Sequence, residues 1–404
     1  MAVAVLTPLP LAPLSAEERA HEARVVAHIR AALAVAGGWL SFADYMDLIL
    51  YAPGLGYYAA GAHKLGAGGD FVTAPELSPA FGRCLATQCA DVLAVLDGGE
   101  ILELGAGSGR LALELIPELA RQGALPARYR ILETSPELRQ RQERTLAALP
   151  PALAARVAWL ERVPEEPYGG VLLANEVLDA LPFERFRWEP GGAGAPPVVE
   201  ALGVAWDGQR FAWRAAPPAA ALAHEVERLA AQLPAGAAAD GSGELCLRLP
   251  AWLAAVTAPL AAGVALILDY GLPRAELYAS ARAGGTLACF HRQRRHEDPF
   301  VNVGLQDLTA WVDFTRVAEA ALDCGLAVAG YTTQALFLLG NDFERHVAAV
   351  AAGEGDVPDP LAAGRAARLV LPGEMGERFK AIALVRHCDV PLRGFALRDF
   401  AARL

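Results

Sequence analysis

Short apolar runs alternate with longer helix-forming segments through the first half of the chain. The runs at 100–104, 129–133, 157–161 and 171–175 predict strands, and the segments at 111–122 and 136–148 predict helices. Strands that alternate with helices form a parallel sheet covered on both faces. Further runs at 264–269, 327–332 and 381–386 bring the count to seven. The pattern therefore predicts an α/β fold with a mostly parallel seven-stranded sheet and helices on both faces.

The segment before this sheet has a different character. Ser15 and Glu18 have the spacing of a capping box, which predicts a helix that ends at Gly37-Gly38. Ser41 begins a second predicted helix that ends at Pro53-Gly54, and another helix is expected over 81–96. Residues 54–79 are rich in glycine and aromatic residues, and a loop of this length is usually functional or disordered. Its aromatic residues argue against disorder. We interpret 1–37 as an N-terminal helical extension and 38–98 as a lid or substrate-side region.

The alternation stops after about Trp188, where the sequence becomes rich in alanine, proline and glycine. Asp207-Gly208 predicts a hairpin turn between strands at 198–205 and 211–214. We interpret 188–260 as an inserted subdomain, which divides the core into 99–187 and 261–404. In the second part, a helix is expected to begin with Asp307 as its N-cap and to end at Gly325.

Composition and charge restrict the class of protein. Of 404 residues, 54% are apolar and 20% are charged, and no apolar run reaches the length of a membrane span, so we expect a soluble protein without membrane insertion. The net charge of −11 argues against nucleic acid as the main partner. The six cysteines are scattered without zinc spacing, so we expect no metal site and a reducing compartment, the cytoplasm. Frequent arginine beside only two lysines, Lys64 and Lys380, suggests GC-rich, bacterial coding.

Ligands in open α/β sheets bind beyond the carboxyl ends of the strands. The first strand ends in Gly105, Gly107 and Gly109, and a helix follows at once. Glycine permits positive φ and close approach of a ligand, and the helix N-terminus then faces that ligand. A dinucleotide fingerprint needs its third glycine at position 110, which is arginine, so an NAD-dependent dehydrogenase is disfavoured. The second strand ends in Glu133, where a carboxylate can accept both ribose hydroxyl hydrogens.

Polar residues also follow the fourth and fifth predicted strands. Asn175 and Glu176 come directly after an apolar run, where packing explains them poorly. Glu176 and Asp179 are three positions apart and would face one pocket if the segment turned helically. The alternative for Asp179 is a cap of the turn before Pro182. Asp269, at the end of the fifth strand, is either functional or part of a strand-end turn.

From Glu103 onward, the pattern Glu-x-Gly-x-Gly-x-Gly resembles the first motif of class I S-adenosylmethionine (SAM) methyltransferases; an ordinary glycine-rich turn is the alternative reading. Over about residues 38–387 the chain resembles the MidA-like family of these enzymes, whose mitochondrial members are assembly factors for respiratory complex I. The resemblance rests on blocks at 45–46, 50–53, 56–58, 69–76, 81–82, 103–109, 133–139, 175–182, 269–271, 304–314, 375–376 and 379–380. The chain departs from the family at Ala74, Ala106 and Trp311, where serine, proline, and histidine or aspartate are usual.

The resemblance implies a class I, Rossmann-like methyltransferase fold with SAM as cofactor and S-adenosylhomocysteine (SAH) as product. The cofactor-binding residues would be Glu103, Gly105, Gly107, Gly109, Glu133 and Asn175, with Asn175 on the methionine part. The implied reaction is methylation of an arginine in a protein substrate, for the mitochondrial members a complex I subunit near the quinone site. Other acceptors, and a non-catalytic assembly chaperone with this fold, stay open, and a homodimer is compatible with the sequence.

A protonated guanidinium is a poor nucleophile because its charge is delocalised. Two carboxylates that bind two of its nitrogens would leave electron density on the third, which points at the methyl group. We expect Glu176 to be one of these carboxylates and Asp179 or Glu76 to be the second. Tyr57 and Tyr58 either stack on the cation or pack within the lid.

Overall fold

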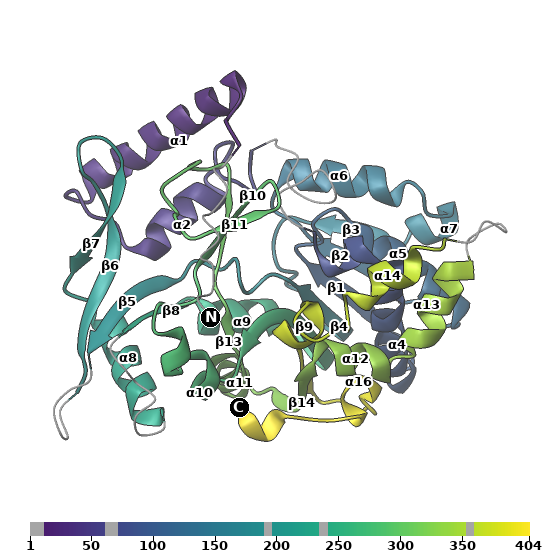
Figure 1. The fold of residues 1–404 in the computed structure, drawn as a ribbon. Coiled ribbons are helices and arrows are strands. Elements are labelled where there is room, and N and C mark those ends of the chain that lie inside the picture. Colours follow the sequence, from purple (N-terminus) through teal and green to yellow (C-terminus); the bar gives the residue numbers. More distant parts are fainter. Residues whose placement is uncertain (1–11, 61–71, 190–195, 234–240, 353–358) are drawn as a thin grey trace, which may run out of the picture.

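The central element of the fold is a mostly parallel sheet (Figure 1). The computed structural model describes residues 12–60, 72–189, 196–233, 241–352 and 359–404. The strand order is β14-β15-β9-β4-β1-β2-β3, and a further short strand, β13, pairs with β9. These strands are β1 (Glu100–Leu104), β2 (Arg128–Leu132), β3 (Val157–Leu160), β4 (Tyr168–Asn175), β9 (Leu260–Leu272), β13 (Val312–Asp313), β14 (Ala327–Thr333) and β15 (Phe379–Arg386). Only β15 runs antiparallel to its neighbours, β9 and β14, which confirms the predicted α/β sheet.

Alternate residues of the strands pack on opposite faces of this sheet. Ile101 of β1 belongs to one apolar cluster, whereas its neighbour Leu102 belongs to another. The first cluster contains residues of α4 (Pro79–Val95), α5 (Arg110–Arg121), α12 (Gln334–Gly340), α13 (Phe343–Ala352), α14 (Ala362–Ala367) and α16 (Arg393–Ala396). The second contains residues of α9 (Leu249–Thr257) and α11 (Phe314–Asp323). Both faces are therefore covered, as apolar strand runs require. The shorter or peripheral helices are α6 (Pro136–Leu146), α7 (Pro151–Ala154), α10 (Arg274–Leu277), α15 (Met375–Arg378), η1 (Ser280–Arg282) and η2 (Ala401–Arg403).

Two smaller antiparallel sheets lie beside the central one. The first has the order β7-β6-β5-β8 and carries α8 (Ala220–Gln232); its strands are β5 (Glu184–Glu189), β6 (Val198–Trp206), β7 (Phe211–Ala216) and β8 (Gly241–Leu245). The predicted hairpin is confirmed, because Asp207 Oδ1 accepts from the backbone N–H groups of Gln209 and Arg210, each at 2.8 Å. The second has the order β11-β10-β12, formed by β10 (Ala288–His291), β11 (Arg294–His296) and β12 (Asp307–Thr309).

The N-terminal helices pack on these smaller sheets. They are α1 (Ala16–Val35) and α2 (Phe42–Tyr51), both of which contact β6 (Figure 1). The short helix α3 (Ala74–Leu77) packs on α4. The predicted capping box is present: Ser15 Oγ accepts from Glu18 N (3.1 Å), and Glu18 Oε2 accepts from Ser15 N (2.7 Å). A third apolar cluster joins the helices to both smaller sheets through residues such as Phe42, Phe211 and Leu308. None of the helices in the described ranges has the length and apolarity needed to cross a bilayer.

The prediction of a helix starting at Asp307 is wrong. Residues Asp307–Thr309 form β12, which pairs with β10, and the helix begins at Phe314, seven residues after Asp307. Asp313 is its N-cap, with the carboxylate accepting from Arg316 N at 3.0 Å. Asp307 is instead 3% exposed and accepts a hydrogen bond from the Tyr58 hydroxyl at 2.8 Å. A three-residue strand has no detectable period of its own, and its partner lies some 20 residues away in sequence.

Candidate active site

A cavity of about 890 Å³ opens at the carboxyl ends of β1, β2 and β4. One wall consists of residues 103–108, 110–111 and 132–138, and the opposite wall includes Tyr51, Pro53, Gly54, Tyr58, Ala59, Thr73 and Pro75. The segment 175–177 and 180–182 lies between the two, with Trp252 and Val256 of α9. This volume falls within the range of cofactor sites. The described residues contain no cluster of three or more His, Cys, Asp and Glu side chains suited to a metal ion.

The glycine turn has the backbone conformation that its sequence suggests. Gly105, Gly107 and Gly109 all have positive φ, at 60°, 55° and 81°. Gly109 is the N-cap of α5, and a Cβ there would lie 3.3 Å from the Cα of Gln142. Gly105 and Gly107 line the cavity, whereas Gly109 lies beneath it against α6. The turn thus exposes backbone, rather than side chains, to a ligand.

Glu133 lies at the end of β2 on the same wall. Its carboxylate accepts from Ser135 N at 2.8 Å and from Gln142 Nε2 at 2.9 Å. Burial raises the pKa of Glu133 above its ordinary value, and these hydrogen bonds oppose the shift. Gln142, which the sequence analysis missed, also donates to the Gly107 carbonyl at 3.1 Å. One amide therefore fixes the glycine turn and the acidic residue relative to each other.

Glu103 lines the cavity from the end of β1. Its side chain is buried, and it accepts a hydrogen bond from the Tyr129 hydroxyl at 2.7 Å. Burial raises the pKa of Glu103 to about 7, although the tyrosine bond stabilises the ionised form. The site therefore contains a carboxyl group that gains or loses its proton near neutral pH.

Asn175 and Glu176 lie where the two walls meet. Glu176 has φ of +55°, a left-handed conformation that is unusual for a residue with a side chain. Its Oε1 accepts from Ala74 N and from Asn175 Nδ2, both at 3.2 Å. Burial, and after it the charge of Asp179, raises the pKa of Glu176 to about 8. Asn175 Oδ1 is buried and has no hydrogen-bond partner in the described part of the chain, so a polar group for a ligand is present.

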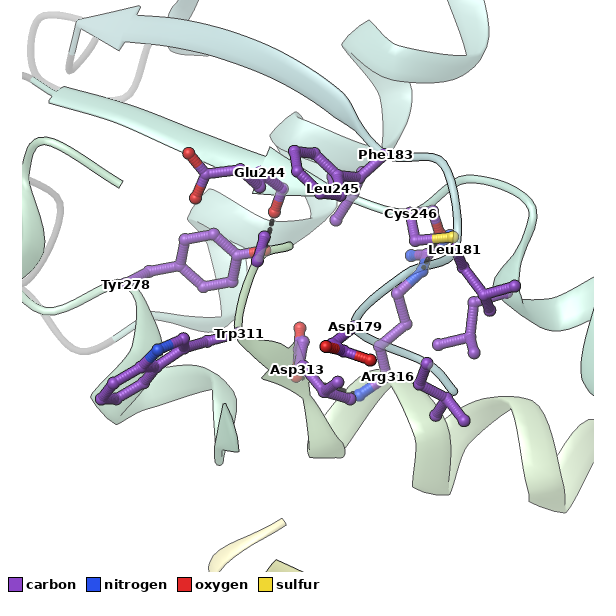
Figure 2. A pocket seen from close by; sticks show the side chains of 14 residues that line it. Asp179, Leu181, Phe183, Glu244, Leu245, Cys246, Tyr278, Trp311, Asp313 and Arg316 are labelled. Carbon is purple, nitrogen blue, oxygen red and sulfur yellow. Dashed lines mark hydrogen bonds between the residues drawn. The ribbon is translucent and has the colours of Figure 1, made fainter. Parts of the chain in front are cut away.

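Asp179 does not line this cavity, in contrast to the expectation that it would face one pocket with Glu176. It lines a second cavity of about 40 Å³, which Figure 2 shows with Asp179, Asp313 and Arg316 around it. Its Oδ2 accepts from the Tyr270 hydroxyl at 2.6 Å, whereas Oδ1 is buried without a partner among the described residues. Burial raises the pKa of Asp179 to about 6.

Asp269 is the physical reason for this difference. Its Oδ2 accepts from the backbone N–H groups of Val177, Leu178 and Asp179, at 3.2, 2.9 and 3.3 Å. The carboxylate thereby folds the segment after Glu176 into a turn that is not helical. The open question about Asp269 is answered in favour of a strand-end turn, and this turn directs Glu176 and Asp179 to different cavities.

The remaining candidates are Glu76, Tyr57, Tyr58 and Trp311. Glu76, on α3, accepts a hydrogen bond from the Ser108 hydroxyl but is not among the residues that line the large cavity. Tyr57 is buried and packs edge-on against Tyr58, with ring centroids 5.1 Å apart. Tyr58 lines the cavity and stacks on Tyr51, with centroids 5.6 Å apart. Trp311 lines the smaller cavity.

The strand order, the glycine turn after β1, the acidic residue after β2 and the polar residues after β4 define the class: a SAM-dependent methyltransferase fold with its cofactor cavity. Comparisons with known proteins agree. A family model described as "Putative S-adenosyl-L-methionine-dependent methyltransferase" matches residues 84–332. A Burkholderia thailandensis protein with a crystal structure bound to SAH is 40% identical, with a TM-score of 0.89, and the match covers 98% of this chain and 100% of that one. A second structure from that organism is 39% identical, with a TM-score of 0.86 and the same coverage.

Among curated proteins, the mitochondrial protein arginine methyltransferase NDUFAF7 of Mus musculus is 29% identical over 379 residues, which are 87% of this chain and 82% of the relative. Its Drosophila melanogaster homologue is 28% identical over 391 residues, which are 89% of this chain and 86% of the relative. The chain belongs to the MidA-like family of SAM-dependent methyltransferases, and SAM is its cofactor. The cavity fits this cofactor, because it combines exposed glycine backbone, a strand-end carboxylate and the buried, unpartnered Asn175 oxygen.

Proposed function

We propose that this methyltransferase acts on an arginine side chain of a protein. The observation that carries the proposal is Glu176, a carboxyl group placed between the glycine wall and the tyrosine wall of one cavity. The described lining is acidic: it contains Glu103, Glu133, Glu137 and Glu176, and its one basic residue, Arg110, pairs with Glu114 at 3.0 Å. Such a lining favours a cationic acceptor. The names of the curated relatives support arginine as that acceptor.

The cofactor supplies an electrophilic methyl group, and the residues of this chain bind and orient it. In this proposal Glu133 binds the ribose hydroxyls, Asn175 binds the methionine part, and the turn Gly105–Gly109 provides backbone contacts with Glu103 behind it. Gly109 contributes by allowing close packing of α6. Catalysis is then mainly positioning and electrostatics.

Glu176 binds the acceptor. Its Oε1 is held by Ala74 N and Asn175 Nδ2, and no residue in the described ranges hydrogen-bonds Oε2, which is left for a guanidinium nitrogen. An arriving cation lowers the pKa of Glu176 from about 8, so binding of the acceptor ionises the carboxyl group that holds it. The charge of the guanidinium is thereby drawn to the bound nitrogen, and another nitrogen becomes the nucleophile, which releases one proton to solvent as it is methylated.

We further infer that the acceptor is a subunit of respiratory complex I, on the basis of the family resemblance, and that the protein acts in the cytoplasm. All six cysteines have free thiols, which suits a reducing compartment. The inserted segment 188–260, whose Trp252 and Val256 line the cofactor cavity, is a candidate surface for the partner.

Two measurements test the proposal. Calorimetric titration of SAM and SAH should show micromolar binding that Glu133→Ala abolishes. Wild-type enzyme and tritium-labelled SAM are then added to an extract of a strain that lacks the enzyme. Acid hydrolysis of the extract proteins should yield labelled methylarginine. Glu176→Gln should keep SAH affinity and lose transfer, whereas Glu184→Gln, a glutamate with raised pKa outside both cavities, should keep both.

The outcomes separate the alternatives. If the protein binds SAH but the label is found on another residue type, the acceptor is not arginine. Transfer retained by Glu176→Gln would remove Glu176 from its role, and absence of SAM and SAH binding would favour the assembly chaperone.

A further inference from the structure

We propose that Tyr58 and Asp307 form the second anchor for the acceptor guanidinium, with the Tyr58 oxygen accepting an N–H and Asp307 acting as a positioning residue. The inference rests on the proposed function and names a partner for Glu176 in the same cavity. Neither carboxylate first considered for this place is directed there: Asp179 bonds Tyr270 beside the smaller cavity, and Glu76 bonds Ser108.

The hydrogen-bond direction gives Tyr58 its selectivity. The hydroxyl donates to Asp307 Oδ1 at 2.8 Å, and a carboxylate can only accept. Burial, and after it the charge of Asp307, holds the pKa of Tyr58 well above its ordinary value, so the hydroxyl keeps its hydrogen at neutral pH. With that hydrogen committed to Asp307, the oxygen offers lone pairs to the cavity. A guanidinium has N–H donors and no acceptor, so it matches this oxygen.

The Tyr58 ring is held in place from several sides. It stacks on Tyr51 at an interplanar angle of 24°, and the Tyr51 hydroxyl is itself fixed by the Ala180 carbonyl at 2.7 Å. The Tyr58 backbone N–H bonds the Leu50 carbonyl at 2.8 Å, directly at the end of α2. Glycine at position 56 permits this close return, because a Cβ there would lie 2.6 Å from the backbone of Leu50. An anchor fixed before binding loses little entropy when the ligand arrives.

Charge links this wall to Glu176. Asp307 lies near enough to Glu176 to contribute to the raised pKa of that carboxyl group. Asp307 is itself buried within β12, so its charge is only weakly screened by solvent. A cation between Glu176 and the Tyr58–Asp307 pair is attracted by the carboxyl groups on both sides, whereas a neutral isostere of arginine is not. The cavity therefore selects for charge as well as for shape.

The test compares three probes on SAH-saturated protein by NMR titration: N-acetyl-arginine methylamide, its lysine counterpart and its uncharged citrulline counterpart. Wild-type protein should bind the arginine probe best, and Tyr58→Phe should weaken it about tenfold with little change for citrulline. Asp307→Asn, which keeps an acceptor for the hydroxyl but loses the charge, should reduce the preference for arginine over citrulline less than Asp307→Ala does. Tyr45→Phe is the matched control, since its hydroxyl bonds the Pro299 carbonyl outside the cavity.

An unchanged SAH dissociation constant shows that each variant is folded. In transfer assays the loss in Tyr58→Phe should fall mainly on the acceptor KM. Equal affinity of wild type and Tyr58→Phe for the arginine probe, or equal affinity of wild type for arginine and citrulline, would overturn the inference. If the wild type forms methylarginine but Tyr58→Phe has an unchanged acceptor KM, the proposed function holds and Tyr58 is not an anchor for the acceptor.

Discussion

Replacing Gln142 by methionine should weaken cofactor binding, although Gln142 does not line the cavity. The side chain is fully buried, and its Nε2 donates to the Gly107 carbonyl (3.1 Å) and to Glu133 (2.9 Å). Its Oε1 accepts from the Trp159 indole at 3.0 Å. Methionine keeps the buried volume and removes all three hydrogen bonds. The glycine turn and Glu133 then lose the group that sets their relative position.

The structure gives the size of the effect. A hydrogen bond to a charged group contributes about 1.5–3 kcal/mol and each of the two neutral ones about 0.5–1.5 kcal/mol, so the free energy of unfolding should fall by about 2.5–6 kcal/mol. Only the bonds to Gly107 and Glu133 hold groups that line the cavity. If about half of their contribution is lost from binding, the SAH dissociation constant rises roughly tenfold.

Calorimetric titration of SAH into Gln142→Met measures this change, and Gln88→Met provides the control. Gln88 is equally buried and accepts from Gly394 N at 3.0 Å, away from the cavity. Both variants should unfold at lower temperature, but only Gln142→Met should bind SAH more weakly. Wild-type SAH affinity in Gln142→Met would refute the reasoning, and equal losses in the two variants would show general destabilisation instead.

Three further predictions concern protonation and packing. The pKa of Glu176 is about 8, so the acceptor kcat/KM should rise about tenfold per pH unit up to that pH, and residual activity of Glu176→Gln should not show this rise. The pKa of Glu103 is about 7 in the folded protein and near 4.5 in the unfolded chain, so the native state binds the proton more tightly and the free energy of unfolding falls as pH rises between these values. The fall amounts to about 3 kcal/mol above pH 7. Thermal unfolding at pH 4–8 should show this pH dependence in the wild type and not in Glu103→Gln. Arg274 is buried and pairs with Asp313 and Glu319, so Arg274→Met should lower the free energy of unfolding, measured in urea, by about 3–5 kcal/mol. Loss of the exposed Arg187–Glu200 pair should lower it by less than about 1 kcal/mol.

The elements that could be predicted from the sequence are those with local causes. Buried parallel strands form apolar runs, a capping box defines the start of α1, and an Asp-Gly pair defines the β6–β7 hairpin. The assignment of Asp307 failed because its role depends on a partner strand and on Tyr58, which is 249 positions away. Aspartate precedes helices and also pairs with tyrosine, and only the tertiary structure decides between the two.

In the candidate site, too, some features follow from the local sequence and others depend on the tertiary structure. Residue types at strand ends indicated the cavity correctly, because the strand order brings these ends together. The directions of the side chains were not predictable. Asp179 turns to a second cavity because Asp269, 90 positions later, binds its backbone N–H. Gln142 is one polar residue among several on α6, and nothing in that helix distinguishes it before the glycine turn is packed against it.

The turn after β4 explains why a strained residue is retained at the centre of the cavity. Glycine at position 176 would adopt φ of +55° without the cost of about 1–2 kcal/mol that a side chain incurs, but it would remove the carboxyl group. Asp269 sustains the conformation, because its carboxylate binds three consecutive N–H groups after Glu176 and also Tyr270 N at 2.8 Å. Burying that carboxylate is costly, yet these four donors satisfy it. The fold thus uses one buried acidic residue on β9 to hold another, Glu176, in the lining of the cavity.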